Sequence, residues 1–313
     1  MKNGPTHKSC CVLVLAMLIT CGFLAKANAA TQAVGNITRA AEVKANRVVL
    51  ETTSRARVSV EFFDIDVVRV RVAPTGTFER DFSYAIDHSH DRKTPIIKVR
   101  QTASQIVLTN AFGARVVINK MPFRIEIFDE SGQTVVNDDA KHPTSFDQAT
   151  GEINTTKLLR GAVETFYGFG EKAFAEMQRN SKYIANWNTD TFSYPIGTDP
   201  IYESIPFFYA LYDGKAYGIF FNNTYRSFFD MGKTSPERYT FGADGGELDY
   251  FVFTGGKQRS PKKVMEDYAA LTGTTVPSFF LDGYSLFSGA YPAETMADAL
   301  RKGHGILRER AAA

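Results

Sequence analysis

Short runs of alternating hydrophobic and polar residues dominate the first half of the chain. In one of them, Val68, Val70 and Val72 alternate with Arg69 and Arg71. Because successive side chains of a strand point to opposite faces, this period predicts a strand with one buried and one solvent-exposed face. Similar runs predict strands at 47–52, 57–63, 105–109, 114–118 and 123–128. Short strands separated by turn clusters favour an antiparallel β-sandwich.

A predicted hairpin is the strongest local signal, and it lies in an aromatic section of the chain. Two apolar runs, 206–212 and 215–221, are joined by Asp213-Gly214, and a tight hairpin turn requires residues that accept positive φ. The section 166–253 holds 24 of the 40 aromatic residues. It predicts further strands at 182–187, 225–230, 238–241 and 247–253. We expect its paired phenylalanines to be core residues: Phe207, Phe208, Phe220, Phe221, Phe228 and Phe229.

The pattern changes after Gly255-Gly256, where a helix is predicted. Ser260 is placed to cap it, Pro261 is suited to its first position and Gly273 to its end. Its apolar face would consist of Val264, Tyr268 and Leu271.

The last 35 residues, 279–313, predict one buried strand at 279–287 and one helix from about 292 to 310. A strand followed by a helix is the repeating unit of a parallel α/β domain. A single unit cannot cover the faces of its sheet or pair its edges. We therefore expect a second domain of which the chain contains only the start.

The first 29 residues have the pattern of a secretory signal peptide. Two lysines precede an apolar run from Cys10 to Ala25, and Ala27-Asn28-Ala29 forms a small-x-small cleavage site. The run is shorter than the roughly 20 residues that a membrane-spanning helix needs. We expect a soluble exported protein, periplasmic or secreted, without a membrane span. Cys21 leaves a lipoprotein signal as the alternative.

Composition and charge narrow the classes of function. The net charge is +2 without a long basic run, which argues against nucleic-acid binding. All three cysteines lie in the predicted leader, so the mature chain has no disulfide or thiolate nucleophile. His88 and His90 place two imidazoles close in sequence, but a metal site needs three or four ligands. We expect no metal and no cofactor.

Several motifs, taken in order, resemble the N-terminal part of family 31 glycoside hydrolases, the α-glucosidase and α-xylosidase family. They are FYGFGEK (166–172), WNTD (187–190), GTDPIYESIPFF (197–208), YGIFFNNTYRS (217–227) and GGELDY (245–250). The resemblance implies a β-sandwich like that of galactose mutarotase, followed by a TIM-type barrel. After the predicted signal peptide at 1–29, it suggests the sandwich at 30–255, a linker helix at 256–278 and the truncated start of a (β/α)8 barrel at 279–313.

This resemblance implies the N-terminal part of an exported retaining α-glycosidase. Such enzymes use two carboxyl groups about 5 Å apart, one as nucleophile and one as acid and base. The family carries both on later barrel strands, so it implies no catalytic residue in this chain and no turnover by the chain alone. The implied ligand is an α-glucoside or α-xyloside, and the implied main partner is the missing barrel domain.

The resemblance also implies a substrate-binding loop. In the family, a loop of the sandwich reaches over the barrel mouth and an aspartate there contacts the sugar; Asp190 is the matching position. A carboxylate suits sugar hydroxyls because it accepts charge-assisted hydrogen bonds. Trp187 and Tyr194 would stack on a sugar ring. The alternatives are that Asp190 caps a turn with Asn188 and that the rings are core.

Two other functions stay open from the sequence. One is a carbohydrate-binding sandwich without chemistry. The other is a mutarotase-like isomerase, which needs an acid and a base in a cleft. The mature chain offers only His88, His90, His142 and His304 as histidines, none of them in the aromatic section. Likeness of fold alone is weak support for a function.

Overall fold

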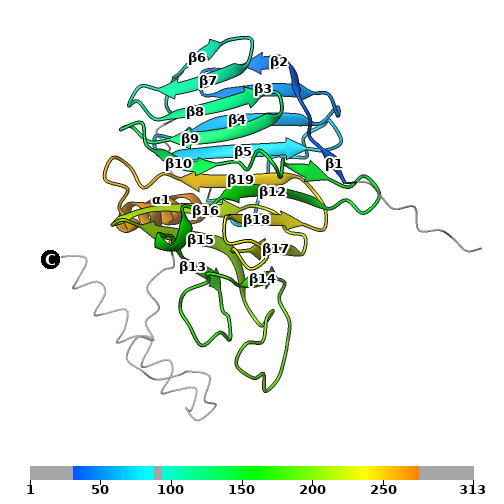
Figure 1. Ribbon diagram of the computed structural model, residues 1–313, viewed down its shortest axis with the longest axis vertical. Helices are drawn as coiled ribbons and strands as arrows, with labels where there is room; N and C mark the ends of the chain where they lie inside the picture. Colours follow the sequence, from blue (N-terminus) through cyan, green and yellow to red (C-terminus); the bar gives the residue numbers. More distant parts are fainter. Residues whose placement is uncertain (1–30, 88–93, 275–313) are drawn as a thin grey trace, which may run out of the picture.

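The computed structural model describes residues 31–87 and 94–274. Within them, antiparallel strands form two packed layers, and two long loops extend below β13 and β14 (Figure 1). The predicted signal peptide, the pair His88 and His90, and the predicted barrel strand at 279–287 lie outside the described residues. None of the helical segments within the described ranges has the length and apolarity needed to cross a bilayer.

One layer is a single eight-stranded sheet in which every neighbouring pair is antiparallel. Its hairpin at Asp213-Gly214 has positive φ at both central residues, as the sequence predicts. The strands lie in the order β13 (Thr165–Gly170), β15 (Ser204–Tyr212), β16 (Lys215–Phe221), β19 (Leu248–Phe253), β5 (Val67–Ala73), β4 (Arg57–Asp64), β3 (Arg47–Thr52) and β2 (Ile37–Val43).

The facing layer consists of two sheets that meet at a bridge between Asp138 and Lys157. The six-stranded sheet has the order β1 (Gln32–Ala33), β11 (Ser145–Phe146), β12 (Ile153–Leu158), β18 (Arg238–Ala243), β17 (Ser227–Asp230) and β14 (Tyr183–Asn186). The five-stranded sheet has the order β10 (Thr134–Asn137), β9 (Phe123–Phe128), β8 (Arg115–Lys120), β7 (Gln105–Asn110) and β6 (Ile97–Gln101). A short 3-10 helix, Gly161–Val163, precedes β13.

Aromatic and branched side chains from both layers form one continuous core between them. Phe208 of the eight-stranded sheet packs edge-on against Phe229 of the six-stranded sheet, with ring centroids 6.0 Å apart. Phe241 meets Tyr250 across the same gap at 5.3 Å. Edge-to-face contacts of this kind are favoured by the ring quadrupoles. The aromatic section of the sequence therefore supplies the centre of a sandwich.

Helix α1 (Pro261–Thr272) covers part of the opposite face of the eight-stranded sheet. Its start after Ser260 and its end before Gly273 confirm the predicted bounds, although the side chain of Ser260 makes no capping hydrogen bond. Val264 and Leu271 are buried, and the ring of Tyr268 stacks on Phe207 with centroids 3.8 Å apart. The predicted apolar face of the helix is thus the face that meets the sheet.

The expectation that the arginine face of β5 is solvent-exposed is wrong. Arg69 is only 5% exposed, because Asp249 of β19 and Asp81 of the segment after β5 both bind its guanidinium. The alternation of valine and arginine correctly separates the two faces of the strand. It does not reveal that a later segment of the chain covers the polar face.

One of the six phenylalanines expected in the core lies elsewhere. Phe228 is half-buried on the outer face of β17, whereas its neighbour Phe229 points into the core and is fully buried. Phe207, Phe208, Phe220 and Phe221 are buried as expected. Because successive residues of a strand face opposite ways, only one of two adjacent phenylalanines can face the same layer.

A buried arginine connects the two layers with the start of α1. The guanidinium of Arg259 donates to Asp129 Oδ2 at 2.5 Å, to the carbonyl oxygen of Gln133 at 2.7 Å, and to the hydroxyl of Tyr212. Asp129 and Gln133 belong to the turn between β9 and β10, and Tyr212 ends β15. Arg259 is 2% exposed, so this ion pair is largely withdrawn from water.

Replacing Arg259 is expected to be strongly destabilising. The variant Arg259→Met leaves the Asp129 carboxylate buried without its cation, which costs about 3–5 kcal/mol of unfolding free energy. Urea unfolding followed by tryptophan fluorescence or circular dichroism measures this loss. The exposed Lys262→Ala on the wet face of α1 serves as control, with an expected change within about 0.5 kcal/mol. Equal losses in the two variants would contradict the assignment.

Candidate functional site

The three predicted substrate-binding residues lie on the segment 187–203, which connects β14 to β15 and is called here the projecting loop. Trp187 is 48% exposed, Asp190 is exposed and Tyr194 is half-buried. The same loop exposes the hydrophobic side chains of Phe192 and Ile196, by 92% and 81%. It lies among the loops that extend below β13 and β14 in Figure 1. Exposed apolar groups concentrated in one place are typical of a contact surface.

A buried ion pair anchors this loop to the sandwich. The ammonium of Lys172 donates to Asp199 Oδ1 and to the carbonyl oxygen of Ala185, each at 2.8 Å. The other oxygen of Asp199 accepts the N–H of Ala185 at 2.6 Å. Burial lowers the pKa of Lys172, although Asp199 acts in the opposite direction. The far part of the loop is thereby tied to the end of β14.

Cross-links within the loop hold its two halves together without regular secondary structure. Thr189 donates its N–H to the carbonyl oxygen of Ile201 at 3.2 Å. The hydroxyl of Tyr202 donates to the carbonyl oxygen of Thr191 at 2.8 Å. Asn188 Oδ1 accepts the N–H of Ser204 at 2.9 Å, which joins the base of the loop to β15. These bonds give the loop a defined shape.

The structure separates the roles of Asn188 and Asp190. Asn188 binds backbone, whereas the carboxylate of Asp190 has no hydrogen-bond partner among the described residues. Tyr194 packs edge-on against Tyr202, with ring centroids 5.6 Å apart. Trp187 stands at the base of the loop, directly after β14. The three predicted residues therefore share one loop, and their contact with a sugar stays a prediction.

Sequence reasoning missed the two residues that hold this loop in place. Lys172 and Asp199 lie 27 positions apart, and no spacing rule for a strand or helix connects them. Lys172 follows a glycine-rich strand and has the appearance of a surface residue in the sequence. Only the fold, which folds the loop back onto the end of β14, brings the two charges together.

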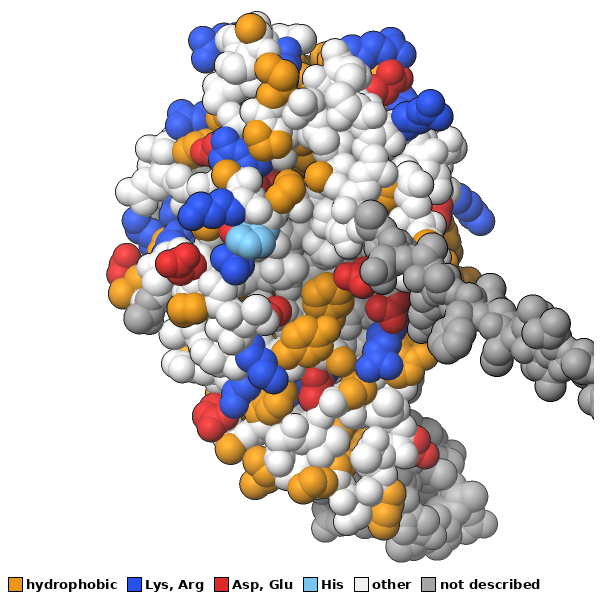
Figure 2. Space-filling model, turned by 45° about the vertical axis from the view of Figure 1, so that its right-hand side comes forward, with side chains coloured by type: hydrophobic (Ala, Val, Ile, Leu, Met, Phe, Trp, Pro, Cys, Tyr) orange, Lys and Arg blue, Asp and Glu red, His pale blue; other side chains and the backbone are white. Residues whose placement is uncertain are grey.

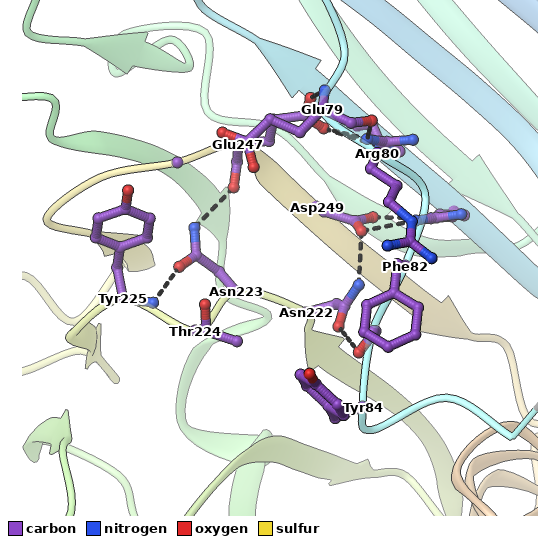
Figure 3. Close-up of a pocket in the computed structure, with 14 residues that line it drawn as sticks. Glu79, Arg80, Phe82, Tyr84, Asn222, Asn223, Thr224, Tyr225, Glu247 and Asp249 are labelled. Carbon is purple, nitrogen blue, oxygen red and sulfur yellow. Dashed lines mark hydrogen bonds and ion pairs between the residues drawn. The ribbon is translucent and has the colours of Figure 1, made fainter.

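A separate cavity of about 220 Å³ lies on the outer face of the eight-stranded sheet, beneath the segment 79–84. Figure 3 shows acidic and amide side chains gathered around it. Asp249 is held by Arg69 and by Asn222, and Glu247 is held by Arg71 at 2.6 Å. Burial raises the pKa of Glu247, although the N–H of Glu79 and Arg71 act in the opposite direction.

Asp249 and Glu247 are thus paired with arginines of β5, and Glu247 also accepts the N–H of Glu79 from the chain after that strand. A carboxylate that is already paired with an arginine is poorly suited to attack a substrate or to transfer a proton. In addition, the described part of the chain groups no three His, Cys, Asp or Glu side chains suited to hold a metal ion.

The two-layer antiparallel sandwich and its anchored projecting loop are typical of galactose mutarotase-like β-sandwich domains. Residues 57–230 match the family model described as the glycosyl hydrolase 31 N-terminal galactose mutarotase-like domain. The chain belongs to glycoside hydrolase family 31. The resemblance seen in the sequence motifs is therefore confirmed.

Known relatives include glycosidases with different substrates. The chain is 35% identical over 239 residues to α-glucosidase 2 of Bacillus thermoamyloliquefaciens, covering 76% of this chain and 29% of that protein. It is 28% identical over 158 residues to the α-xylosidase XylQ of Lactiplantibacillus pentosus, covering 49% of this chain and 19% of that protein.

Among solved structures, a mutant of the family 31 dextranase of Flavobacterium johnsoniae complexed with isomaltotriose is similar. It has 32% identity and a TM-score of 0.70, with coverage of 78% of this chain and 29% of the dextranase. The chain thus spans less than a third of the length of these relatives.

Removing Asp199 is expected to loosen the projecting loop while the sandwich remains folded. Asp199→Ala leaves the buried ammonium of Lys172 without its carboxylate and the N–H of Ala185 without its acceptor. We expect proteolytic cleavage within 187–203 to become faster by about tenfold or more, because a lost charged hydrogen bond has this size. Limited proteolysis followed by mass spectrometry locates and times the cut.

Asp190→Ala is the matched control for this experiment, because Asp190 is on the same loop and has no hydrogen-bond partner among the described residues. Its cleavage rate is expected to equal that of the unmodified chain. The same rate for all three proteins would rule out Asp199 as the anchor of the loop.

Proposed function

We propose that this chain is the N-terminal part of an exported retaining α-glycosidase, similar to α-glucosidases, and that its projecting loop contributes to substrate binding. The observation that carries the proposal is a loop held by a buried ion pair. It presents exposed rings and a carboxylate that has no hydrogen-bond partner among the described residues. Membership of family 31 and the similarity to a named α-glucosidase support the class of reaction.

In this proposal the loop orients the sugar and does not carry out the reaction. Asp190 accepts hydrogen bonds from sugar hydroxyls, and Trp187 and Tyr194 present ring faces or edges to the pyranose. Cleavage with retention needs two carboxyl groups about 5 Å apart on either side of the glycosidic bond. We expect these groups to come from a catalytic domain beside the loop, since Asp249 and Glu247 of the cavity in Figure 3 are paired with arginines.

The substrate class follows from the same relatives. The structure of the dextranase holds isomaltotriose, and one relative is named an α-xylosidase. We propose an α-glucoside as the ligand of the loop, with an α-xyloside as the second candidate. Both offer hydroxyl groups that suit the carboxylate of Asp190.

The role of Asp190 can be tested in a chimera that replaces the matched segment of the Bacillus α-glucosidase with residues 31–274 of this chain. Relative to the unmutated chimera, Asp190→Asn is expected to lower kcat/KM for maltose and isomaltose by about 10- to 100-fold, the size of a lost charged hydrogen bond. Steady-state glucose release measures this effect.

Asp213→Asn is the control, because it removes the same charge from an exposed hairpin turn of the sandwich. Its kcat/KM is expected to remain that of the chimera. If Asp190→Asn also leaves kcat/KM unchanged, the loop does not bind substrate through this residue.

We propose that the protein is exported after cleavage near Ala29. Mass spectrometry of the periplasmic or secreted protein is then expected to find Ala30 as its first residue.

The chain alone is expected to be inactive. The purified protein should release no glucose from maltose or a nitrophenyl α-glucoside above an inert control. Measurable turnover that survives further purification would show that the chain carries its own catalytic carboxylates.

A further inference from the structure

A wide groove crosses the outer face of the six-stranded sheet, on the side of the molecule that Figure 2 brings forward. Its volume is about 640 Å³. Hydrophobic side chains gather near the middle of this view, with charged side chains around them. Each of the six strands contributes outward-facing side chains to the groove, among them Ala33, Ser145, Thr156, Thr240, Phe228 and Tyr183.

Two parallel rings form the aromatic end of this groove. The rings of Tyr183 on β14 and Phe228 on β17 lie within 6° of parallel, with centroids 5.7 Å apart. Tyr183 is 47% exposed, and its hydroxyl has no hydrogen-bond partner among the described residues. Rings on the outer face of a sheet do not contribute to the core between the layers. They are available to stack on the apolar face of a ligand.

The floor between the rings and the opposite edge consists of small neutral polar groups. Ser145 donates to Asn154 Oδ1 at 3.1 Å, and the hydroxyls of Thr156 and Thr240 lie 2.9 Å apart. Hydroxyl and amide groups keep further donor or acceptor capacity after one such bond. They therefore suit a ligand that presents many hydroxyl groups.

The carboxylates at the groove have partners within the protein. His142 Nδ1 lies 2.6 Å from Asp139 Oδ2, and Arg238 lies 4.0 Å from the same oxygen. The carboxylate of Asp230 accepts the backbone N–H groups of Lys233 and Thr234. Because these carboxylates already have partners, a cationic ligand would gain little there. Lys141 also lines the groove, without an ion-pair partner among the described residues. The floor itself is neutral, which favours a neutral ligand.

The length of the groove favours a chain over a single sugar. Five gaps between the six strands, each about 4.8 Å, span about 24 Å. We infer that the groove binds a neutral oligosaccharide, with one sugar ring on Tyr183 and Phe228 and its neighbours over the threonine and asparagine floor. This site is independent of the projecting loop, which begins at the far end of β14.

Calorimetric titration of the 313-residue chain with maltohexaose, isomaltohexaose and glucose tests the inference. At least one hexasaccharide is expected to bind. The affinity for glucose is expected to be lower by about tenfold or more. Tyr183→Ala and Phe228→Ala should each weaken hexasaccharide binding by about tenfold, as expected for one lost ring contact. Tyr183→Phe keeps the ring and should retain most of the affinity, which separates stacking from a loss of folding.

Two controls distinguish this groove from other aromatic surfaces. Tyr84→Ala removes a tyrosine that is 94% exposed beside the cavity of Figure 3, and it should leave the affinity unchanged. Trp187→Ala removes the ring of the projecting loop, so a loss of affinity in this variant measures binding at the loop and not at the groove. A loss of affinity in Tyr183→Ala that is larger than the loss in Trp187→Ala supports the groove.

Other outcomes would overturn the inference. Absence of hexasaccharide binding at millimolar concentration would do so, as would affinity lost in Trp187→Ala and kept in Tyr183→Ala. Affinity lost only in Trp187→Ala would leave the proposed role of the loop intact. Conversely, an unchanged kcat/KM of Asp190→Asn in the chimera would count against the loop and not against the groove. Accelerated mutarotation of fresh α-glucose that disappears in His142→Ala would make the groove an isomerase site instead.

Discussion

The described structure depends on covering both faces of the eight-stranded sheet. All six residues of β19 are buried, which requires material on each side of that strand. One side is covered by the six- and five-stranded sheets through the aromatic core. The other is covered at one end by α1 and at the other by the segment after β5, which Asp81 fastens to Arg69. A sheet buried on both faces provides a rigid support for irregular segments at its edges.

Strand β14 shows how this support reaches both proposed sites. Ile184 is buried in the core between the layers, which fixes the strand. Tyr183 consequently faces outward into the groove. The N–H and carbonyl of Ala185 are bound by Asp199 and Lys172, which orient the projecting loop that follows. One edge strand, positioned by its pairing with β17 and by the buried Ile184, thus sets the direction of a loop and of an aromatic surface.

The sequence predicted features whose cause is local. The hairpin at Asp213-Gly214 and the bounds of α1 are both confirmed, and they follow from Asp213-Gly214 at the turn, Pro261 at the start of the helix and Gly273 at its end. Features that depend on distant segments were not accessible. The charge of Arg69 indicates a solvent-exposed side chain. Its burial depends on Asp249, which lies 180 residues away in the sequence and forms no local pattern with it. Phe228 was placed in the core because a run of two phenylalanines does not show which one faces inward. The three loop residues came from the family resemblance, whereas their anchor, Lys172, required the fold.

Buried ion pairs recur where irregular backbone meets a sheet. Arg259 fastens the turn between β9 and β10, Arg69 the segment after β5, and Lys172 the projecting loop. Desolvation offsets much of the attraction in such pairs, so they add little net stability compared with hydrophobic packing. Their contribution is to fix the orientation of the attached backbone segment, because a hydrogen bond is directional whereas hydrophobic burial is not. A loop that must present Asp190 at a fixed place therefore needs a polar anchor, and hydrophobic burial alone would leave its position undefined.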